Sequence, residues 1–123
     1  MTRSVPHLHA GGDTPVTLIN AFSVPMAKEE RFLSCWKDNA RFMAAAPGFV
    51  GARMLRAMSD QAELTFINVA EWATGAALDE ARRNPEWYAS VRRLLDDPDL
   101  SEVRARPMVY QAAVDVAPGD LLR

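Results

Sequence analysis

The chain has 123 residues and a mass of 13.6 kDa, which is enough for one domain with one hydrophobic core. Its net charge of −2, its pI of about 5.6 and the scatter of its arginines exclude the basic surface that nucleic-acid binding requires. No apolar run is long enough for a membrane span or for the core of a signal peptide, and the single cysteine, Cys35, excludes an internal disulfide, so we expect a cytoplasmic protein without membrane contacts.

The first part of the chain predicts an arm, a strand and a helix. Residues 1–15 contain two prolines and two glycines without periodicity, which is typical of a flexible N-terminal arm. Residues 16–24 (VTLINAFSV) form a β-rich run that Pro25 ends. Over residues 27–45 we expect an amphipathic helix, because apolar side chains recur on one of its faces: Phe32, Trp36, Ala40 and Met43.

A hairpin and a short helix follow. Residues 49–57 (FVGARMLRA) and 63–72 (ELTFINVAEW) have the composition of strands, and the SDQA stretch between them is typical of a turn. Thr74 is a suitable cap for a short helix that ends near residue 82.

A last helix and a last strand complete the domain. Asn84 and Pro85 suit the N-cap and the first position of the helix, whose inner face is expected to consist of Trp87, Val91, Leu94 and Leu95. Residues 103–116 predict the final strand, with an irregularity around Pro107, and residues 117–123 a C-terminal tail.

The predicted order within residues 16–116 is β-α-β-β-α-β. This order is that of the α+β ferredoxin-like fold, an antiparallel sheet with its helices on one face. Such a sheet alternates apolar and polar residues when its other face is in water, but the first and third strands are apolar on both faces. Because one chain of this length cannot supply a second sheet, we expect a homodimer that packs its sheets face to face.

Two asparagines, Asn20 and Asn68, interrupt these apolar strands. A side-chain amide that is buried without partners costs roughly 1–3 kcal/mol, so each needs a partner. One interpretation is that the amide bonds to backbone at a bulge or strand end. The other places Asn68 in a cavity between sheet and helices together with Trp72, which lies on the same strand face and offers a flat ring and an N–H donor.

Other polar side chains are weaker candidates. Tyr88 and Arg92 lie one turn apart on the last helix, beside its core stripe, and face either solvent or the rim of this cavity. Glu71 lies on the face opposite Asn68 and is not expected to act as a base. The sequence contains no recognisable metal constellation, Ser-His-Asp set or phosphate loop, so any catalysis is expected to proceed without histidine and without metal.

The segment PGFVGARMLRA, followed by FINVAEW, resembles the antibiotic biosynthesis monooxygenase family over roughly residues 16–116. The resemblance implies a ferredoxin-like domain that dimerises through its sheets into an α+β barrel. Known activities of that family include cofactor-independent oxidation of anthrones and related phenols to quinones, quinol oxidation, haem degradation and isomerisation of small phosphorylated sugars.

Several family residues have counterparts in this sequence. Asn68 and Trp72 match the asparagine and tryptophan of the anthrone oxygenases, and Arg92 falls near a family arginine. A family tyrosine expected shortly after the tryptophan is replaced by Leu78, and Tyr88 would substitute only with a different geometry. Asn20 and Trp72 also suit the haem-degrading branch, but that branch needs an axial histidine that this sequence lacks after the tryptophan, so haem degradation ranks below oxygenation.

The resemblance implies a small aromatic substrate, O2 as co-substrate and no cofactor. Asn68, Trp72 and Arg92 are the expected catalytic residues, and the substrate-binding residues are expected to be Asn20, Phe22, Trp36, Phe66 and Tyr88. Fixed donors in a dry cavity would stabilise the oxyanion of a phenol or anthrone, which then reduces O2 directly. Two alternatives remain open: an isomerase or cyclase on the same scaffold, and a non-catalytic dimeric binding domain in which Asn68 is structural.

Overall fold

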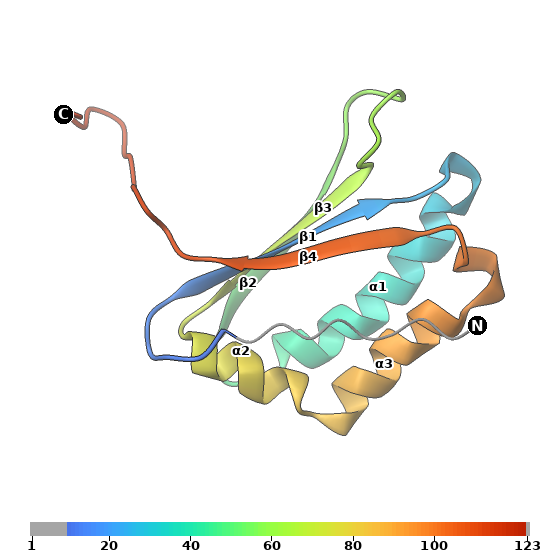
Figure 1. Ribbon diagram of the computed structural model, residues 1–123, viewed down its shortest axis with the longest axis horizontal. Coiled ribbons are helices and arrows are strands. Elements are labelled where there is room, and N and C mark those ends of the chain that lie inside the picture. The colour runs from blue at the N-terminus through green and yellow to red at the C-terminus, as the bar shows by residue number, and fades with distance from the viewer. Residues whose placement is uncertain (1–9, 123) are drawn as a thin grey trace.

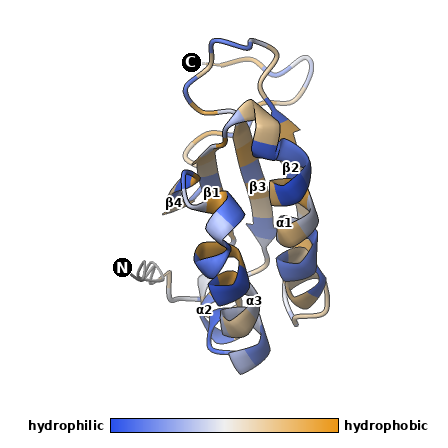
Figure 2. Cartoon of the chain, turned by 90° about the vertical axis from the view of Figure 1, so that its right-hand side faces the viewer, coloured by the Kyte–Doolittle hydropathy of each residue, from blue (hydrophilic) through white to orange (hydrophobic). Residues whose placement is uncertain are grey.

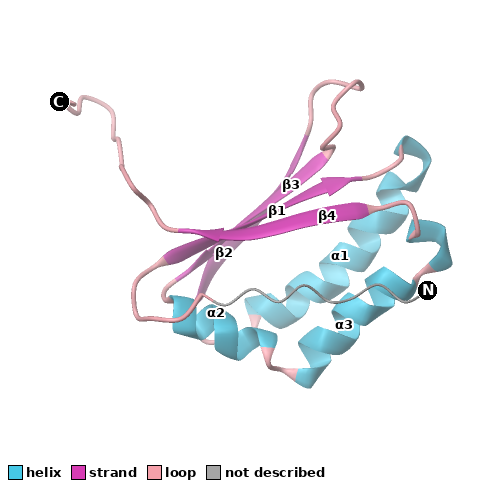
Figure 3. Cartoon of the chain, viewed as in Figure 1, coloured by secondary structure: helices cyan, strands magenta, loops and turns pink. Residues whose placement is uncertain are grey.

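The computed structural model describes residues 10–122, and in this part of the chain four strands form one antiparallel sheet in the order β2-β3-β1-β4. The α-helices of the same residues all lie on one face of the sheet (Figure 1 and Figure 3). The elements in chain order are β1 (Val16–Ser23), η1 (Met26–Lys28), α1 (Glu29–Ala44), β2 (Phe49–Arg56), β3 (Phe66–Trp72), α2 (Gly75–Arg82), α3 (Pro85–Asp96), η2 (Pro98–Leu100) and β4 (Arg104–Tyr110). The predicted ferredoxin-like α+β fold is confirmed.

Local side-chain caps explain where the two later helices begin. The Thr74 hydroxyl oxygen accepts a hydrogen bond from the backbone N–H of Ala77 at 3.0 Å, and α2 starts at the next residue, as predicted. The Asn84 side-chain oxygen accepts from the N–H of Glu86 at 2.8 Å, with Pro85 as the first residue of α3. Within residues 10–122, none of the helices combines the length and the apolar character needed to cross a membrane.

Two strand boundaries differ from the prediction by more than one residue. β3 begins at Phe66 instead of residue 63, because Thr65 is used to close the end of β1: its hydroxyl accepts from the N–H of Val24 at 2.8 Å. β4 ends at Tyr110 instead of residue 116, because Tyr110 already pairs with Thr17, next to the start of β1. Pro107 does not interrupt β4, contrary to the expected irregularity.

The hydrogen-bond register fixes the position of Asn20 and Asn68. The N–H of Ala57 donates to the carbonyl of Thr65 at 2.8 Å, and the bonded pairs of an antiparallel ladder recur every second residue. Odd-numbered residues of β3 therefore direct their backbone groups to β2, and Asn68 directs its own to Asn20 in β1. Pro107, on the other side of Asn20, removes no bond from the ladder, because the backbone of Asn20 is engaged with β3.

The core between sheet and helices consists of two groups of buried side chains. The Phe32 cluster contains Phe22, Val24, Phe32, Phe66, Leu94, Leu100 and Val103. The Trp72 cluster contains Val16, Met43, Ala70, Trp72 and Leu78. Trp36 of α1 packs against both clusters and so lies between them.

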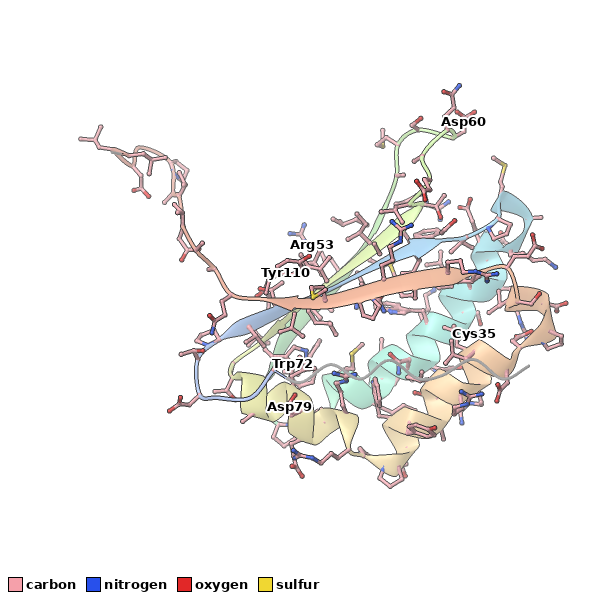
Figure 4. The ribbon with its side chains drawn as sticks, in the orientation of Figure 1. Cys35, Arg53, Asp60, Trp72, Asp79 and Tyr110 are labelled. Carbon is pink, nitrogen blue, oxygen red and sulfur yellow. The ribbon has the colours of Figure 1, made fainter. Side chains whose placement is uncertain are left out.

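The opposite face of the sheet carries apolar side chains that are partly exposed. Ile19 pairs with Val69 at its centre, and both are half-buried, whereas Leu55 and Met108 near the edges are 46% and 53% exposed. Figure 2 shows hydrophobic residues along the strands and hydrophilic ones on the outer sides of the helices. In Figure 4, Arg53 and Tyr110 lie on this face, away from the helices. The prediction that the first and third strands are largely apolar on both faces agrees with the positions of Ile19 and Val69.

The chain ends are arranged differently. Residues 1–9 of the predicted arm lie outside the described residues, whereas residues 10–14 lie against α2. At the other end, the chain after Tyr110 leaves the sheet as an extended segment (Figure 1).

Candidate functional site

The candidate site lies on the helix-facing side of the two central strands. Asn68 is 3% exposed and Trp72 is 1% exposed, and both alternate with the outward-facing residues of β3. Asn20 of β1 is the direct cross-strand partner of Asn68 and shares its face. In Figure 4, Trp72 lies on the side of the helices, near α2.

Three polar atoms in this region are buried without a hydrogen-bond partner among the described residues. They are the side-chain oxygens of Asn20 and Asn68 and the indole nitrogen Nε1 of Trp72. All three belong to residues predicted from the sequence as site residues. If Asn68 is a structural amide bonded to backbone, that bond involves its NH2 group, because its oxygen has no partner among the described residues.

Other buried polar side chains of the protein have partners, which makes the three orphan atoms informative. The Asn39 amide donates to the Ser90 hydroxyl oxygen at 2.8 Å between α1 and α3, and that hydroxyl in turn donates to the carbonyl of Trp87. Asp79 accepts two backbone hydrogen bonds. Within residues 10–122 the unpaired buried atoms are thus confined to the central strands, where they face an apolar region. Each carries a desolvation cost of roughly 1–3 kcal/mol unless a ligand binds there.

Aromatic rings surround this region. The ring of Phe32 packs against Phe22 and Phe66 with centroid separations of 4.8 and 5.5 Å, and Phe49 meets Trp72 edge-to-face at 5.2 Å. Trp36 borders both clusters from α1. The predicted lining residues Phe22, Trp36 and Phe66 are therefore all on the same side of the sheet as Asn68.

The two candidates on α3 are placed differently. Arg92 forms an ion pair with Asp96, one turn further along the helix, and its side chain is 18% exposed. Tyr88 is 50% exposed, so a large part of its ring faces solvent. The structure brings Asn20, Asn68 and Trp72 together on one sheet face, with Arg92 and Tyr88 on the neighbouring helix.

The chemistry of the orphan groups suits an oxygen-bearing ligand. An indole N–H donates, a carboxamide oxygen accepts, and a carboxamide that turns about its last side-chain bond presents its NH2 group instead. A phenol or a cyclic ketone has oxygens that match such a set. Donors held in a region without water stabilise a charge that develops on that oxygen more strongly than water does.

Sequence reasoning missed a polar group at the end of α3. Asp97 accepts hydrogen bonds from Arg31 Nε at 2.8 Å and from the N–H of Asp99 at 2.9 Å. Burial opposes ionisation of Asp97, but the Arg31 hydrogen bond and the other donors hold its pKa below the ordinary value. Asp97 precedes Pro98 in the order expected for an N-cap, and this signal would have identified it.

Cys35 lies beside this carboxylate. Its Sγ is 3.9 Å from the Asp97 oxygen, and burial raises the pKa of the thiol above its usual range. A raised pKa favours the protonated thiol over the nucleophilic thiolate, which agrees with a packing role for Cys35.

Comparison with known proteins agrees with this geometry. A family model described as antibiotic biosynthesis monooxygenase matches residues 15–93. No curated protein sequence matches the chain significantly.

Solved structures of similar fold include two oxygenase-related proteins. SnoaB from Streptomyces nogalater, a cofactor-independent oxygenase, is 25% identical with a TM-score of 0.66, over 85% of this chain and 98% of its own. A second SnoaB structure, which carries an asparagine-to-alanine substitution, is 26% identical with a TM-score of 0.68 over the same shares. A provisionally assigned monooxygenase from Shewanella loihica PV-4 is 28% identical, with a TM-score of 0.66, and covers 85% of this chain and 100% of its own.

A haem-degrading protein from Mycobacterium tuberculosis has the same fold. It is 21% identical, with a TM-score of 0.59, and covers 85% of this chain and 100% of its own. At that identity the likeness establishes the shared architecture and carries no statement about the reaction.

Proposed function

Since this chain belongs to the antibiotic biosynthesis monooxygenase family, we propose that it is a cofactor-independent monooxygenase that uses O2 to oxidise an aromatic polyketide-like phenol or anthrone to a quinone. The observation that carries the proposal is the set of three orphan atoms: the side-chain oxygens of Asn20 and Asn68 and the indole nitrogen of Trp72. The similarity to the cofactor-independent oxygenase SnoaB, at 25% identity, supports the same reaction class.

The reaction balances without a cofactor. An anthrone loses a proton from its central methylene group, and the resulting anion transfers electrons to O2. The peroxide that forms at this carbon then loses water, so one anthrone and one O2 give one quinone and one H2O. The substrate supplies the electrons that a flavin or a metal supplies in other oxygenases.

The site residues have distinct roles in this proposal. Trp72 Nε1 and the Asn68 carboxamide hold the substrate oxygen and stabilise the negative charge that develops on it, which makes the anthrone more acidic. Asn20 binds a second oxygen function from the adjacent strand position. Phe22, Trp36 and Phe66 line the ring system, while Arg92 and Tyr88 contribute charge and contact from α3.

We also propose that two copies associate through their sheets. The half-buried pair Ile19 and Val69 and the exposed Leu55 and Met108 form a largely apolar surface on the side without helices. Burial of such a face against a second copy is favourable because it removes apolar area from water. We place the protein in the cytoplasm, because its one cysteine is free and a reducing compartment suits it.

Oxygen consumption tests the proposed reaction. The purified protein is incubated with 1,8-dihydroxyanthrone in air and under nitrogen, with quinone formation followed by absorbance and O2 by an electrode. We expect a protein-dependent rate in air, one O2 consumed for each quinone formed, and no quinone under nitrogen. An O2-independent conversion of the substrate identifies an isomerase or cyclase, and tight binding without turnover identifies a binding domain. Either result contradicts the proposal.

A further inference from the structure

The chain immediately before β1 is held against α2 by a set of specific contacts. We call residues 10–14 the strap. Both carboxylate oxygens of Asp79 accept backbone hydrogen bonds from it: Ala10 N–H donates at 2.9 Å and Gly11 N–H at 2.6 Å. Asp79 is 7% exposed, and these two donors offset the cost of burying its carboxylate. In Figure 4, Asp79 lies on α2 beneath Trp72.

The first turn of α2 supplies further contacts to the strap. The N–H of Gly75 donates to the carbonyl of Thr14 at 3.1 Å, and the N–H of Ala76 donates to that of Gly12 at 2.8 Å. These N–H groups have no acceptor within the helix, so the strap satisfies them. Gly75 is also close to the strap: a Cβ at this position would lie 1.9 Å from the carbonyl oxygen of Gly11. Only glycine fits under the strap in this position.

The strap covers the end of the core that contains Trp72. Ala10 packs against the Trp72 cluster, to which Leu78 of α2 also belongs. Trp72 itself is 1% exposed, and its orphan Nε1 is shielded from solvent. The strap therefore packs against the same cluster of side chains that contains this donor.

We propose that the strap is a wall of the substrate site, latched by Asp79 and Gly75, and that it excludes water from Trp72 during the reaction. Asp79 and Gly75 are positioning residues, because they act through the strap and do not touch the substrate. The strap is held by hydrogen bonds of its backbone groups, by the packing of Ala10 and by a hydrogen bond from Gln111 Nε2 to the Thr14 hydroxyl oxygen at 2.9 Å. This small set of contacts lets it open without unfolding the core. This inference rests on the proposed function for its effect on turnover.

Two substitutions should weaken the contacts between the strap and α2, each by a different route, and we call them the latch variants. Gly75→Ala introduces a methyl group where the Gly11 carbonyl lies, although alanine is a better helix former than glycine by about 1 kcal/mol. Asp79→Ala removes the acceptor of the Ala10 and Gly11 N–H groups. Glu80→Ala is the matched control, because Glu80 is an exposed residue of the same helix that pairs with Arg83. The double variant Gly75→Ala/Asp79→Ala tests whether both changes act through the strap.

The first measurement does not depend on activity. In a Trp36→Phe/Trp87→Phe background Trp72 is the only tryptophan, and acrylamide quenching of its fluorescence reports its access to solvent. We expect each latch variant to increase the quenching constant severalfold and to accelerate hydrogen exchange in residues 10–14, with no further increase in the double variant. The control should match the parent protein. Unchanged quenching and exchange in both latch variants would overturn the proposal.

The second measurement is turnover of 1,8-dihydroxyanthrone by the latch variants with all three tryptophans present. We expect kcat to fall by roughly ten- to a hundredfold with a much smaller change in KM, because the donor is still present but is exposed to water and less well positioned. If Trp72 becomes accessible while kcat is unchanged, the strap is not part of the catalytic site and the proposal is wrong. If the wild type does not oxidise the anthrone, the proposed function fails, while the quenching and exchange results still decide whether the strap is a latched wall.

Discussion

Asn20 and Asn68 lie directly opposite each other on the two central strands, and their backbones form a hydrogen-bonded pair. Both side-chain oxygens are buried without a partner among the described residues. The backbone of this pair is thus used by the sheet, whereas its side-chain oxygens have no partner among the described residues. The sheet therefore holds the two amides in fixed positions while their side-chain oxygens still lack a hydrogen-bond partner.

Replacement of Asn68 should affect activity much more than stability. Loss of one fixed donor to a developing oxyanion lowers turnover by about a hundredfold or more, so Asn68→Ala should reduce the kcat for 1,8-dihydroxyanthrone by that amount. Its buried oxygen has no hydrogen-bond partner among the described residues, so the substitution should not lower the free energy of unfolding by more than about 1 kcal/mol. Urea unfolding and steady-state kinetics measure both quantities.

Asn39 is the matched control for that variant. Its amide is also buried but donates to the Ser90 hydroxyl at 2.8 Å. Asn39→Ala should therefore lower the free energy of unfolding by roughly 1–3 kcal/mol and leave kcat close to that of the wild type. Equal losses of activity in the two variants would show that Asn68 acts only through the fold.

Trp72→Phe tests the indole N–H separately from the ring. Phenylalanine keeps an aromatic contact with Phe49 but has no donor, so kcat should fall at least about tenfold while the protein remains folded. The corresponding control is Trp87→Phe, since Trp87 lies on α3 under the guanidinium of Arg82, whose group centre is 5.6 Å from the ring centroid. A variant at position 72 with normal kcat would remove the indole N–H from the mechanism.

A charge on the free sheet face should prevent dimerisation. Val69 lies opposite Ile19 in the middle of that face, and Val69→Arg would bury an unpaired charge between two sheets at a cost of several kcal/mol. Light scattering coupled to gel filtration should show a dimer for the wild type and a monomer for the variant at micromolar concentration. Lys37→Glu, on the exposed side of α1, should remain dimeric. A monomeric wild type would contradict the proposed association.

The buried carboxylate of Asp97 should stabilise the fold in a pH-dependent way. Its pKa is lowered in the folded protein, so its contribution is complete above the pKa of an unfolded aspartate, about 4, and is lost as the pH falls through the folded value. Asp97→Asn should reduce the free energy of unfolding at neutral pH by roughly 1–2 kcal/mol, since the residue also caps η2. The difference between variant and wild type should shrink below about pH 4.

Urea unfolding at neutral and acid pH measures this difference. Asp38→Asn serves as a control, because Asp38 is exposed and forms only a surface pair with Arg41. A difference between Asp97→Asn and the wild type that is the same at neutral and acid pH would exclude ionisation of Asp97 as its source.

The sequence predicted the fold well because local signals and the periodicity of apolar residues agree. The caps at Thr74 and Asn84 fixed the starts of α2 and α3, and the alternation around Asn68 fixed which face of β3 is buried. The boundaries of β3 and β4 were not predictable from composition, because they depend on pairing with β1: Thr65 closes one end, and the pairing of β4 with β1 ends at Tyr110.

Prediction of the candidate site was only partly successful. Asn20 and Asn68 were singled out because they interrupt apolar strands, and Trp72 because it shares a strand face with Asn68; one polar atom of each is unpaired among the described residues. The contacts of Asp79 with the strap were not predicted, because they join residues 68 and 69 positions apart in the sequence and involve backbone donors of a segment without periodicity. Long-range contacts to backbone leave no pattern that a single sequence reveals.

Pro107 has a consequence for how copies of this protein assemble. It lies in the middle of β4, an outermost strand of the sheet, and its nitrogen points outward because Asn20 is bonded to the opposite neighbour. At that position the edge strand has no backbone N–H that could donate a hydrogen bond to another extended segment. Proline at a border strand discourages lateral growth into fibrils or continuous two-subunit sheets. The β4 edge is therefore poorly suited to pairing with a strand of a second copy, in keeping with the proposed association through sheet faces.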